Sequence, residues 1–283
     1  MIVWICTDME GLAGVDDWEH CYAVADDDPR YLFGLEQLAG DTNAAVAGCF
    51  DAGATEVRVL DGHGRNRNRG LAGRLDPRAR LVWIARRDPV RWEGLDSEVQ
   101  AVAVIGQHAM AGTIGGFLDH TQIPKQVCRL TAAGREIGEL AQIALHTGAF
   151  GIPVAYVSGD EALCREAHAL LPHVVSTVTK QGTGWATCAL RDPATVRAEI
   201  RRDIARALGT VRRENALEWA SPFEVTLEWA WTEPADRMAK VHGVRRVDAR
   251  TVAWTLRDAC DIHTWPSAAW SPDGADPIGR KPQ

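Results

Sequence analysis

The chain has 283 residues, enough for one large domain or two modest ones, and 46% of them are hydrophobic while 24% are charged. This composition excludes a mainly disordered protein. The longest apolar stretches, such as residues 101–106, are far shorter than the ~20 residues that a membrane-spanning helix needs. A formal net charge of −7 argues against nucleic acid or an anionic membrane as a main partner.

Short apolar runs alternate with helical patterns through the first two thirds of the chain. Runs rich in Val, Ile and Trp predict buried strands at 1–6, 57–60, 81–85, 101–106 and 154–159. Helical spacing is found at 35–53, 138–151 and 160–172. This alternation predicts an α/β fold with three layers (α/β/α), in which helices cover both faces of a largely parallel or mixed sheet. Residues 128–138 instead predict a hairpin around Ala133 and Gly134.

The last third of the chain predicts a smaller α+β part. A helix with Asp192 as N-cap and Pro193 at its first position is expected over 192–209. Further on, we expect a strand, a helix and an extended segment at 223–231, 235–243 and 245–256. We therefore predict a metal-binding catalytic domain, a C-terminal domain that serves oligomerisation and channel lining, and a disordered tail, over 1–190, 191–270 and 271–283.

The cysteines indicate a reducing compartment. Seven of them are widely spread, an odd number without CxxC or zinc-finger spacing. Cys6 and Cys128 lie in apolar strands, which argues against a nucleophilic role. The first residues, MIVWICTDMEG, contain no basic leader. These features predict a cytoplasmic protein with free thiols.

Side chains of the kind that bind metals follow several predicted strands. Asp8 and Glu10 come after the first strand, His63 after the second, His108 after the fourth and Asp160 after the fifth. Ligands of α/β proteins bind at the carboxyl ends of parallel strands, so these segments should meet at one edge of the sheet. Asp8 and Glu10 are two residues apart and point the same way on extended backbone.

Carboxylate and imidazole ligands together suit zinc, manganese or iron. Two such ions ~3.5–4 Å apart can share a carboxylate and hold a hydroxide between them. Asp8 is the natural bridge, because its side chain is short and begins directly at a strand end. Structural interpretations stay open: Asp160 can be the N-cap of the next helix, and His108 a hydrogen-bonded buried histidine. The residues alone support both interpretations about equally.

Several motifs occur in the order found in one peptidase family: TDMEGLAGV (7–15), DGHG (61–64), GQHAMAGT (106–113), DHT (119–121) and GEL (138–140). With the later VSGDEA and VTKQ, this combination resembles the M55 peptidases, the D-aminopeptidase family of binuclear zinc enzymes, over residues 1–182. The resemblance implies two divalent ions, zinc or alternatively manganese, and a ring-like homo-oligomer such as a decamer. It implies five metal ligands: Asp8, Glu10, His63, His108 and Glu139.

Two site residues depend on the resemblance. Glu139 by itself is only a first-turn glutamate that the helix dipole favours. His120 matches the family's catalytic histidine, whereas the residues alone also allow an exposed loop histidine. It follows the glycine-rich segment 111–119, whose amide N–H groups we expect to face a developing oxyanion. The sequence leaves open whether His120 is a nucleophile or a general acid/base.

Other residues are given structural interpretations. Lys180 is expected to be an exposed lysine at a strand end, with a carbonyl-binding role as the alternative. Residues 86–92 are expected to form a solvated face. Large aromatic residues late in the chain are expected in the core or at a subunit interface. They are Trp219, Trp229, Trp231, Trp254, Trp265 and Trp270.

These observations predict a binuclear metal-dependent aminopeptidase. We expect it to hydrolyse the N-terminal peptide bond of short peptides by attack of a metal-bound hydroxide, with His120 as the catalytic residue. The sequence leaves open whether the N-terminal residue is of the D or L form. One alternative is a related metallo-amidohydrolase that acts on a non-peptide amide or lactam. Another is an inactive homologue that binds a metal or ligand.

Overall fold

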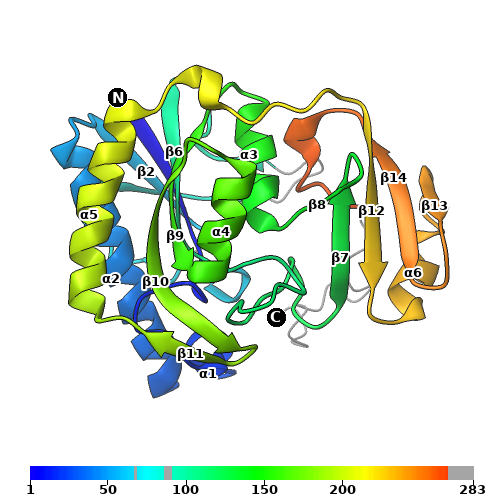
Figure 1. The fold of residues 1–283 in the computed structure, drawn as a ribbon, viewed down its shortest axis with the longest axis horizontal. Coiled ribbons are helices and arrows are strands. Elements are labelled where there is room, and N and C mark those ends of the chain that lie inside the picture. The colour runs from blue at the N-terminus through cyan, green and yellow to red at the C-terminus, as the bar shows by residue number, and fades with distance from the viewer. Residues whose placement is uncertain (67–68, 86–90, 267–283) are drawn as a thin grey trace.

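The computed structural model describes residues 1–66, 69–85 and 91–266, which form two larger β-sheets and one small one. The first sheet has seven strands, and all its neighbouring strands are parallel except the last pair, β10 and β11 (Figure 1). Its spatial order is β11 (Thr187–Leu190), β10 (Val175–Gly184), β9 (Val154–Asp160), β6 (Val99–Gln107), β1 (Ile2–Thr7), β2 (Glu56–Asp61) and β3 (Arg80–Val82).

Helices cover both faces of this sheet, as the strand–helix alternation predicts. The helices α2 (Pro29–Asp51) and α5 (Pro193–Thr210) pack on one face, and α3 (Glu139–Gly148) and α4 (Glu161–Leu170) on the other (Figure 1). Both faces of the central strands are therefore buried, which is why those strands are almost wholly apolar. The short helix α1 (Trp18–Tyr22) precedes α2. The three-layer architecture is confirmed.

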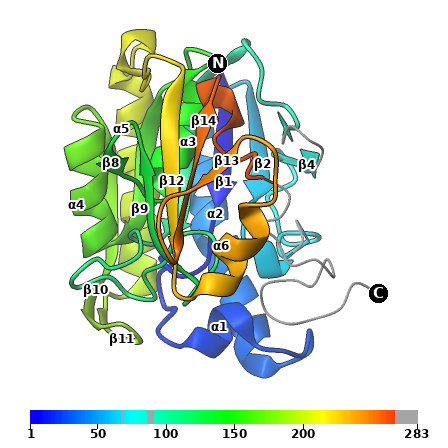
Figure 2. The ribbon, with the colours of Figure 1, turned by 90° about the vertical axis from the view of Figure 1, so that its right-hand side faces the viewer.

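The second sheet is antiparallel and packs around its own core, beside the first sheet (Figure 2). Its order is β13 (Val244–Arg246), β14 (Thr251–Leu256), β12 (Phe223–Trp229), β7 (Val127–Ala132) and β8 (Arg135–Glu136). The helix α6 (Thr232–Met238) contacts this sheet. The predicted hairpin at Ala133 and Gly134 is confirmed, and both residues have positive φ, at 51° and 75°.

The layers do not follow the expected division of the chain at residue 190. The hairpin β7–β8 precedes that position but lies in the second sheet, because β7 pairs with β12. The helix α5 follows it but packs on the first sheet, since its apolar residues share a core with α2. Contacts between segments so far apart in the sequence produce no local sequence pattern, so the sequence could not predict which sheet these elements join. The domain limits themselves stay a prediction.

Some predicted elements have different bounds. The helix expected from residue 35 begins at Pro29, because Asp28 accepts a hydrogen bond from the amide of Arg30 as its N-cap. The strand expected at 81–85 is divided between β3 and β4 (Ile84–Ala85), and β4 pairs with β5 (Arg91–Trp92). The extended segment expected over 245–256 is the hairpin of β13 and β14.

Among the late tryptophans, Trp229, Trp254 and Trp265 are buried, as predicted, whereas Trp231 is exposed. Trp270, the tail over 271–283 and residues 86–90 lie outside the described residues. Short 3-10 helices occur at Gly64–Asn66, Arg213–Asn215 and Ala259–Asp261. No helix in the described part of the chain is long and apolar enough to cross a membrane.

Candidate metal centre

The metal-type side chains gather where the strand order of the first sheet reverses. From β1 the chain continues through β2 and β3 on one side, and then through β6, β9 and β10 on the other. The loops that leave β1 and β6 therefore diverge and open a crevice at the carboxyl ends of the strands. Asp8 and Glu10 follow β1, His63 follows β2, and His108 follows β6 directly.

Two glycines let the loop after β1 approach β6. The Gly11 amide donates to the carbonyl of Gly106 at 2.8 Å. A Cβ atom on Gly11 would lie 2.0 Å from the carbonyl oxygen of Gln107, so no other residue fits there without a shift. Gly106 has a φ of 72°, which also favours glycine. These contacts hold Asp8 and Glu10 beside His108.

The structure brings the five predicted ligands and His120 together. Three groups of ligand atoms each lie within 4.8 Å of one another. They consist of Asp8, Glu10 and His63; of Asp8, His108 and Glu139; and of Glu10, His108 and His120. Asp8 is common to the first two groups.

Backbone carbonyl groups orient two of the imidazoles. The Nδ1 atom of His108 donates to the carbonyl of Ala109 at 2.9 Å, and Nδ1 of His120 donates to that of Leu118 at 2.8 Å. Because a carbonyl only accepts, each ring carries a proton on Nδ1 and directs Nε2 into the cluster. The two rings stack with centroids 3.7 Å apart. His120 is buried, so the exposed-loop interpretation is wrong.

Burial and mutual contact determine the charges of the cluster. Burial, together with a neighbouring carboxylate, raises the pKa of Asp8 well above its usual range. Burial also opposes ionisation of Glu139, yet the proximity of His108 lowers the pKa of Glu139 to about 2. Burial and the nearby His108 lower the pKa of His120 to about 4. Several carboxylates so far from water need positive charge close by.

Buried polar atoms of the cluster that lack a hydrogen-bond partner indicate whether a metal ion fits there. Glu10 Oε2, both ring nitrogens of His63 and His108 Nε2 are buried without a hydrogen-bond partner in the described part of the chain. His63 Nε2 lies 3.4 Å from Glu10 Oε1, and His108 Nε2 lies 3.4 Å from Asp8 Oδ2. Two ligand atoms about 2.1 Å from a tetrahedral zinc lie about 3.4 Å apart. The side chains therefore fit around a cation.

Two further residues contact the cluster and were missed from the sequence. The hydroxyl of Tyr22, at the end of α1, donates to Glu10 Oε1 and lies 3.4 Å from His120 Nε2. Gln107 Nε2 donates to Asp8 Oδ2 at 2.8 Å. Gln107 could have been suspected as the last residue of a strand that ends at a candidate ligand. Tyr22 gave no signal, because a helix of five residues shows no periodicity.

Comparison with known proteins identifies the family. The family model of the M55 peptidases, described as D-aminopeptidase, matches residues 1–268. This chain belongs to the M55 peptidase family. A D-aminopeptidase from Bacillus subtilis (strain 168) is 30% identical over 195 residues, which cover 69% of this chain and 69% of that protein. The solved structure of the Zn-dependent D-aminopeptidase DppA from Bacillus subtilis, a self-compartmentalizing protease, matches with a TM-score of 0.85 and 25% identity, over 93% of this chain and 94% of that chain.

In this M55 family member, Asp160 joins two elements next to the site. One carboxylate oxygen accepts from the amide of Leu163 at 2.7 Å, which confirms Asp160 as the N-cap of α4. The other accepts from the amide of Phe117 at 2.7 Å. Asp160 thus fixes the glycine-rich segment that leads to His120, and it belongs to none of the three ligand groups.

The amides of the glycine-rich segment have partners within the protein. Gly112 and Thr113 donate to the carboxylate of Asp119, Phe117 donates to Asp160, and Leu118 donates to the carbonyl of Trp185. The expectation that this segment offers free amides to an oxyanion is therefore wrong for these four. Their hydrogen bonds instead give the segment a defined shape.

The expectation of an exposed Lys180 is wrong. Its side chain is fully buried, and its ammonium group donates to the carbonyls of Glu10 and Val15. The ammonium also lies 4.7 Å from the ring centroid of Phe117. Lys180 lies within β10, which pairs with both β9 and β11, and its ammonium group contacts the loop that carries Glu10. Lys180 thus supports the backbone of a predicted ligand.

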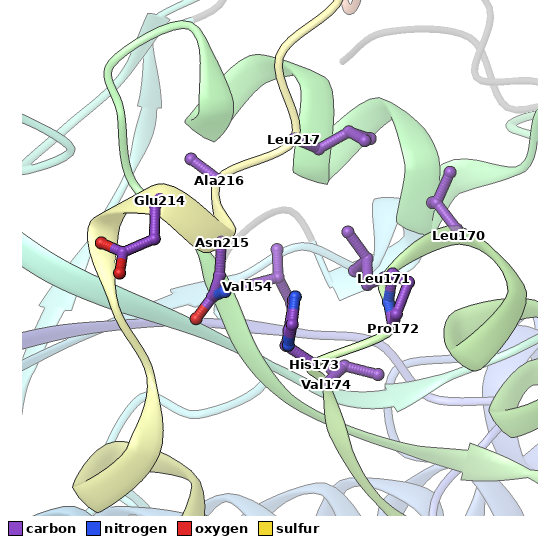
Figure 3. A pocket seen from close by; sticks show the side chains of 10 residues that line it. All are labelled: Val154, Leu170, Leu171, Pro172, His173, Val174, Glu214, Asn215, Ala216 and Leu217. Carbon is purple, nitrogen blue, oxygen red and sulfur yellow. The ribbon is translucent and has the colours of Figure 1, made fainter.

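A separate pocket lies at the opposite edge of the first sheet (Figure 3). The pocket is lined by the start of β9, by the end of α4 with the residues that follow it, and by residues 214–217. Most of the lining side chains are aliphatic. Its polar side chains are those of His173, Glu214 and Asn215, none of which belongs to a ligand group. The chemistry-bearing residues therefore collect at the carboxyl ends of the strands and not in this pocket.

Proposed function

We propose that this chain is a binuclear zinc aminopeptidase that acts on short peptides, including those that begin with a D-residue. The observation that carries the proposal is the pair of ligand groups that share Asp8. In this assignment Asp8, Glu10 and His63 hold one ion, while Asp8, His108 and Glu139 hold the other. The Zn-dependence and the name of DppA, a fold relative, support zinc and D-peptides.

The chain's own residues account for an exopeptidase. When bound, the zinc ions supply Lewis acids that polarise the peptide carbonyl and acidify a water molecule. In this proposal the free α-amine of the substrate lies beside the cluster, so that only the first peptide bond is placed for cleavage.

His120 is assigned the proton transfer. Its Nδ1 proton is held by the carbonyl of Leu118, so Nε2 presents a lone pair to the cluster. In that tautomer Nε2 accepts the proton that the attacking water loses and then returns it to the leaving amine. The Tyr22 hydroxyl, 3.4 Å away, is positioned to restrict the ring.

Assembly and location are part of the proposal. DppA is a self-compartmentalizing protease, which supports a closed homo-oligomer for this chain. A decameric ring is the form of assembly that we propose. Such an enclosure admits only small peptides as substrates. Free thiols support the cytoplasmic location that we propose, and they are those of Cys6, Cys21, Cys49, Cys128, Cys164 and Cys188.

The proposal is tested with zinc-loaded protein and the p-nitroanilides of D-Ala and L-Ala. We expect turnover of the D-form, and about two zinc ions per chain by elemental analysis. His120→Ala should retain zinc and lose at least about a hundredfold in kcat. His242→Ala, at an exposed histidine, is the matched control and should match the wild type. Zinc binding without turnover of any short peptide would refute the aminopeptidase and favour another amide or an inactive homologue.

A further inference from the structure

One ammonium group near the centre is held in a defined place without an acidic partner. Lys125 Nζ lies 4.9 Å from the ring centroid of Trp18 and 4.8 Å from that of Trp185. The two indoles are themselves 5.7 Å apart. Lys125 is exposed, and none of the ion pairs formed among the described residues includes it. Contact with two rings fixes the cation while part of its surface faces solvent.

The indoles connect this cation to the proposed catalytic residues. Trp18 stacks on Tyr22 with centroids 4.0 Å apart, and the hydroxyl of Tyr22 lies 3.4 Å from His120 Nε2. Trp185, between β10 and β11, donates from Nε1 to the carbonyl of Asp119 at 3.2 Å. The hairpin β10–β11 and α1 lie at the same end of the molecule (Figure 1). The cation therefore stands at the rim of the metal centre.

The loop that carries Lys125 is held in a strained shape. Leu118, Gln122 and Lys125 have φ values of 52°, 62° and 63°, in the left-handed region that non-glycine residues rarely adopt. The Gln122 amide donates to Glu139 Oε1 at 2.6 Å, which ties the loop to a predicted zinc ligand. Strain of this kind persists where the surrounding contacts impose it, and it is concentrated at functional sites.

We propose that Lys125 binds the C-terminal carboxylate of a short peptide whose amine end lies at the metal centre. The inference rests on the proposed function and adds a length limit to it. A metal centre that receives the amine end and a fixed cation at the rim would engage both ends of a free peptide. Because each further residue lengthens an extended peptide by up to about 3.5 Å, two contacts at a fixed separation limit the length of the peptide. Substrates that lack the terminal carboxylate lose this contact.

The test compares three substrates of zinc-loaded protein. They are D-Ala-D-Ala, its C-terminal amide, and the amide of D-Ala-D-Glu, which carries its only carboxylate on a side chain. Lys125→Met retains the aliphatic stem against both indoles and removes the charge. Lys125→Arg retains the charge, and Lys240→Met is the control at an exposed lysine far along the chain.

For Lys125→Met we expect kcat/KM on D-Ala-D-Ala to fall about tenfold, mainly through KM, since one charge-assisted contact is lost. Both amides should change less than about twofold, and Lys125→Arg should restore the preference for the free acid. Equal losses on all three substrates would indicate a merely structural role and overturn the proposal. A loss confined to the D-Glu amide would overturn it in favour of a side-chain carboxylate. A wild type that prefers no free acid refutes the subsite alone, whereas one that cleaves no substrate refutes the proposed function and the subsite with it.

Discussion

Replacement of Lys180 by methionine tests whether a buried cation stabilises the loop that carries Glu10. The ammonium group donates to two carbonyls of residues 8–15, those of Glu10 and Val15. The same loop receives a hydrogen bond from Thr179 to the carbonyl of Gly11, at 2.6 Å. Methionine is of similar length, so the substitution fills the space and removes the ammonium group with its charge and its donors.

The expected magnitude follows from opposing contributions. A hydrogen bond from a charged donor is worth ~1.5–3 kcal/mol, and a buried carbonyl left without a partner costs ~1–3 kcal/mol. In the other direction, the variant no longer buries a charge, and burial already lowers the pKa of Lys180. The two carbonyls belong to a loop fixed at both ends, so they cannot find new partners. We therefore expect a net loss of about 3 kcal/mol in the free energy of unfolding.

Calorimetry and zinc titration measure the outcome. A loss of about 3 kcal/mol lowers Tm by about 6–12 °C in a chain of this size class. Zinc affinity should fall as well, because the Glu10 backbone is released. Lys240→Met should leave both quantities unchanged. If Lys180→Met keeps Tm within about 2 °C of the wild type and binds zinc as tightly, the argument from unsatisfied carbonyls is refuted.

Three further outcomes are expected. Chelation of zinc should lower Tm reversibly, because zinc at a thousand times its Kd stabilises the folded state by about 4 kcal/mol, and an unchanged Tm on a calorimetric scan would contradict a bound metal. Gly11→Ala should bind fewer than two zinc ions by elemental analysis, because its Cβ would lie 2.0 Å from the carbonyl oxygen of Gln107. The control is Gly209→Ala, whose Cβ would have no atom within 4 Å, and it should bind zinc as the wild type does. The hydrogen bond from the Met110 amide lowers the pKa of Glu166, but burial has the larger effect and raises this pKa from 4.5 to about 7. The folded state therefore retains a proton on Glu166 that the unfolded state loses. Relative to Glu166→Gln, the wild type should therefore lose stability on the order of 2 kcal/mol between pH 4.5 and 7 in urea titrations, and a gain over that range would refute the sign.

The sequence by itself indicated the central strands of the first sheet and four residues of the candidate site. Strands of the parallel sheet are buried on both faces, so they appear as short apolar runs that need no partner to be recognised. Asp8, Glu10, His63 and His108 could be found because each stands at or just past the end of such a run. Glu139 and His120 have no such position, since one begins a helix and the other lies in a loop, and only the family motifs indicated them.

Tertiary structure decided what depends on contact between distant segments. The pairing of β7 with β12 joins residues about a hundred positions apart and places a hairpin of the first half in the second sheet. Tyr22 and Lys180 reach the centre because the α1 helix and β10 pack against the loop that follows β1. The local sequence shows which side chains are apolar and with what period they recur. The neighbours of a polar side chain are determined only by tertiary folding, which brings distant segments into contact.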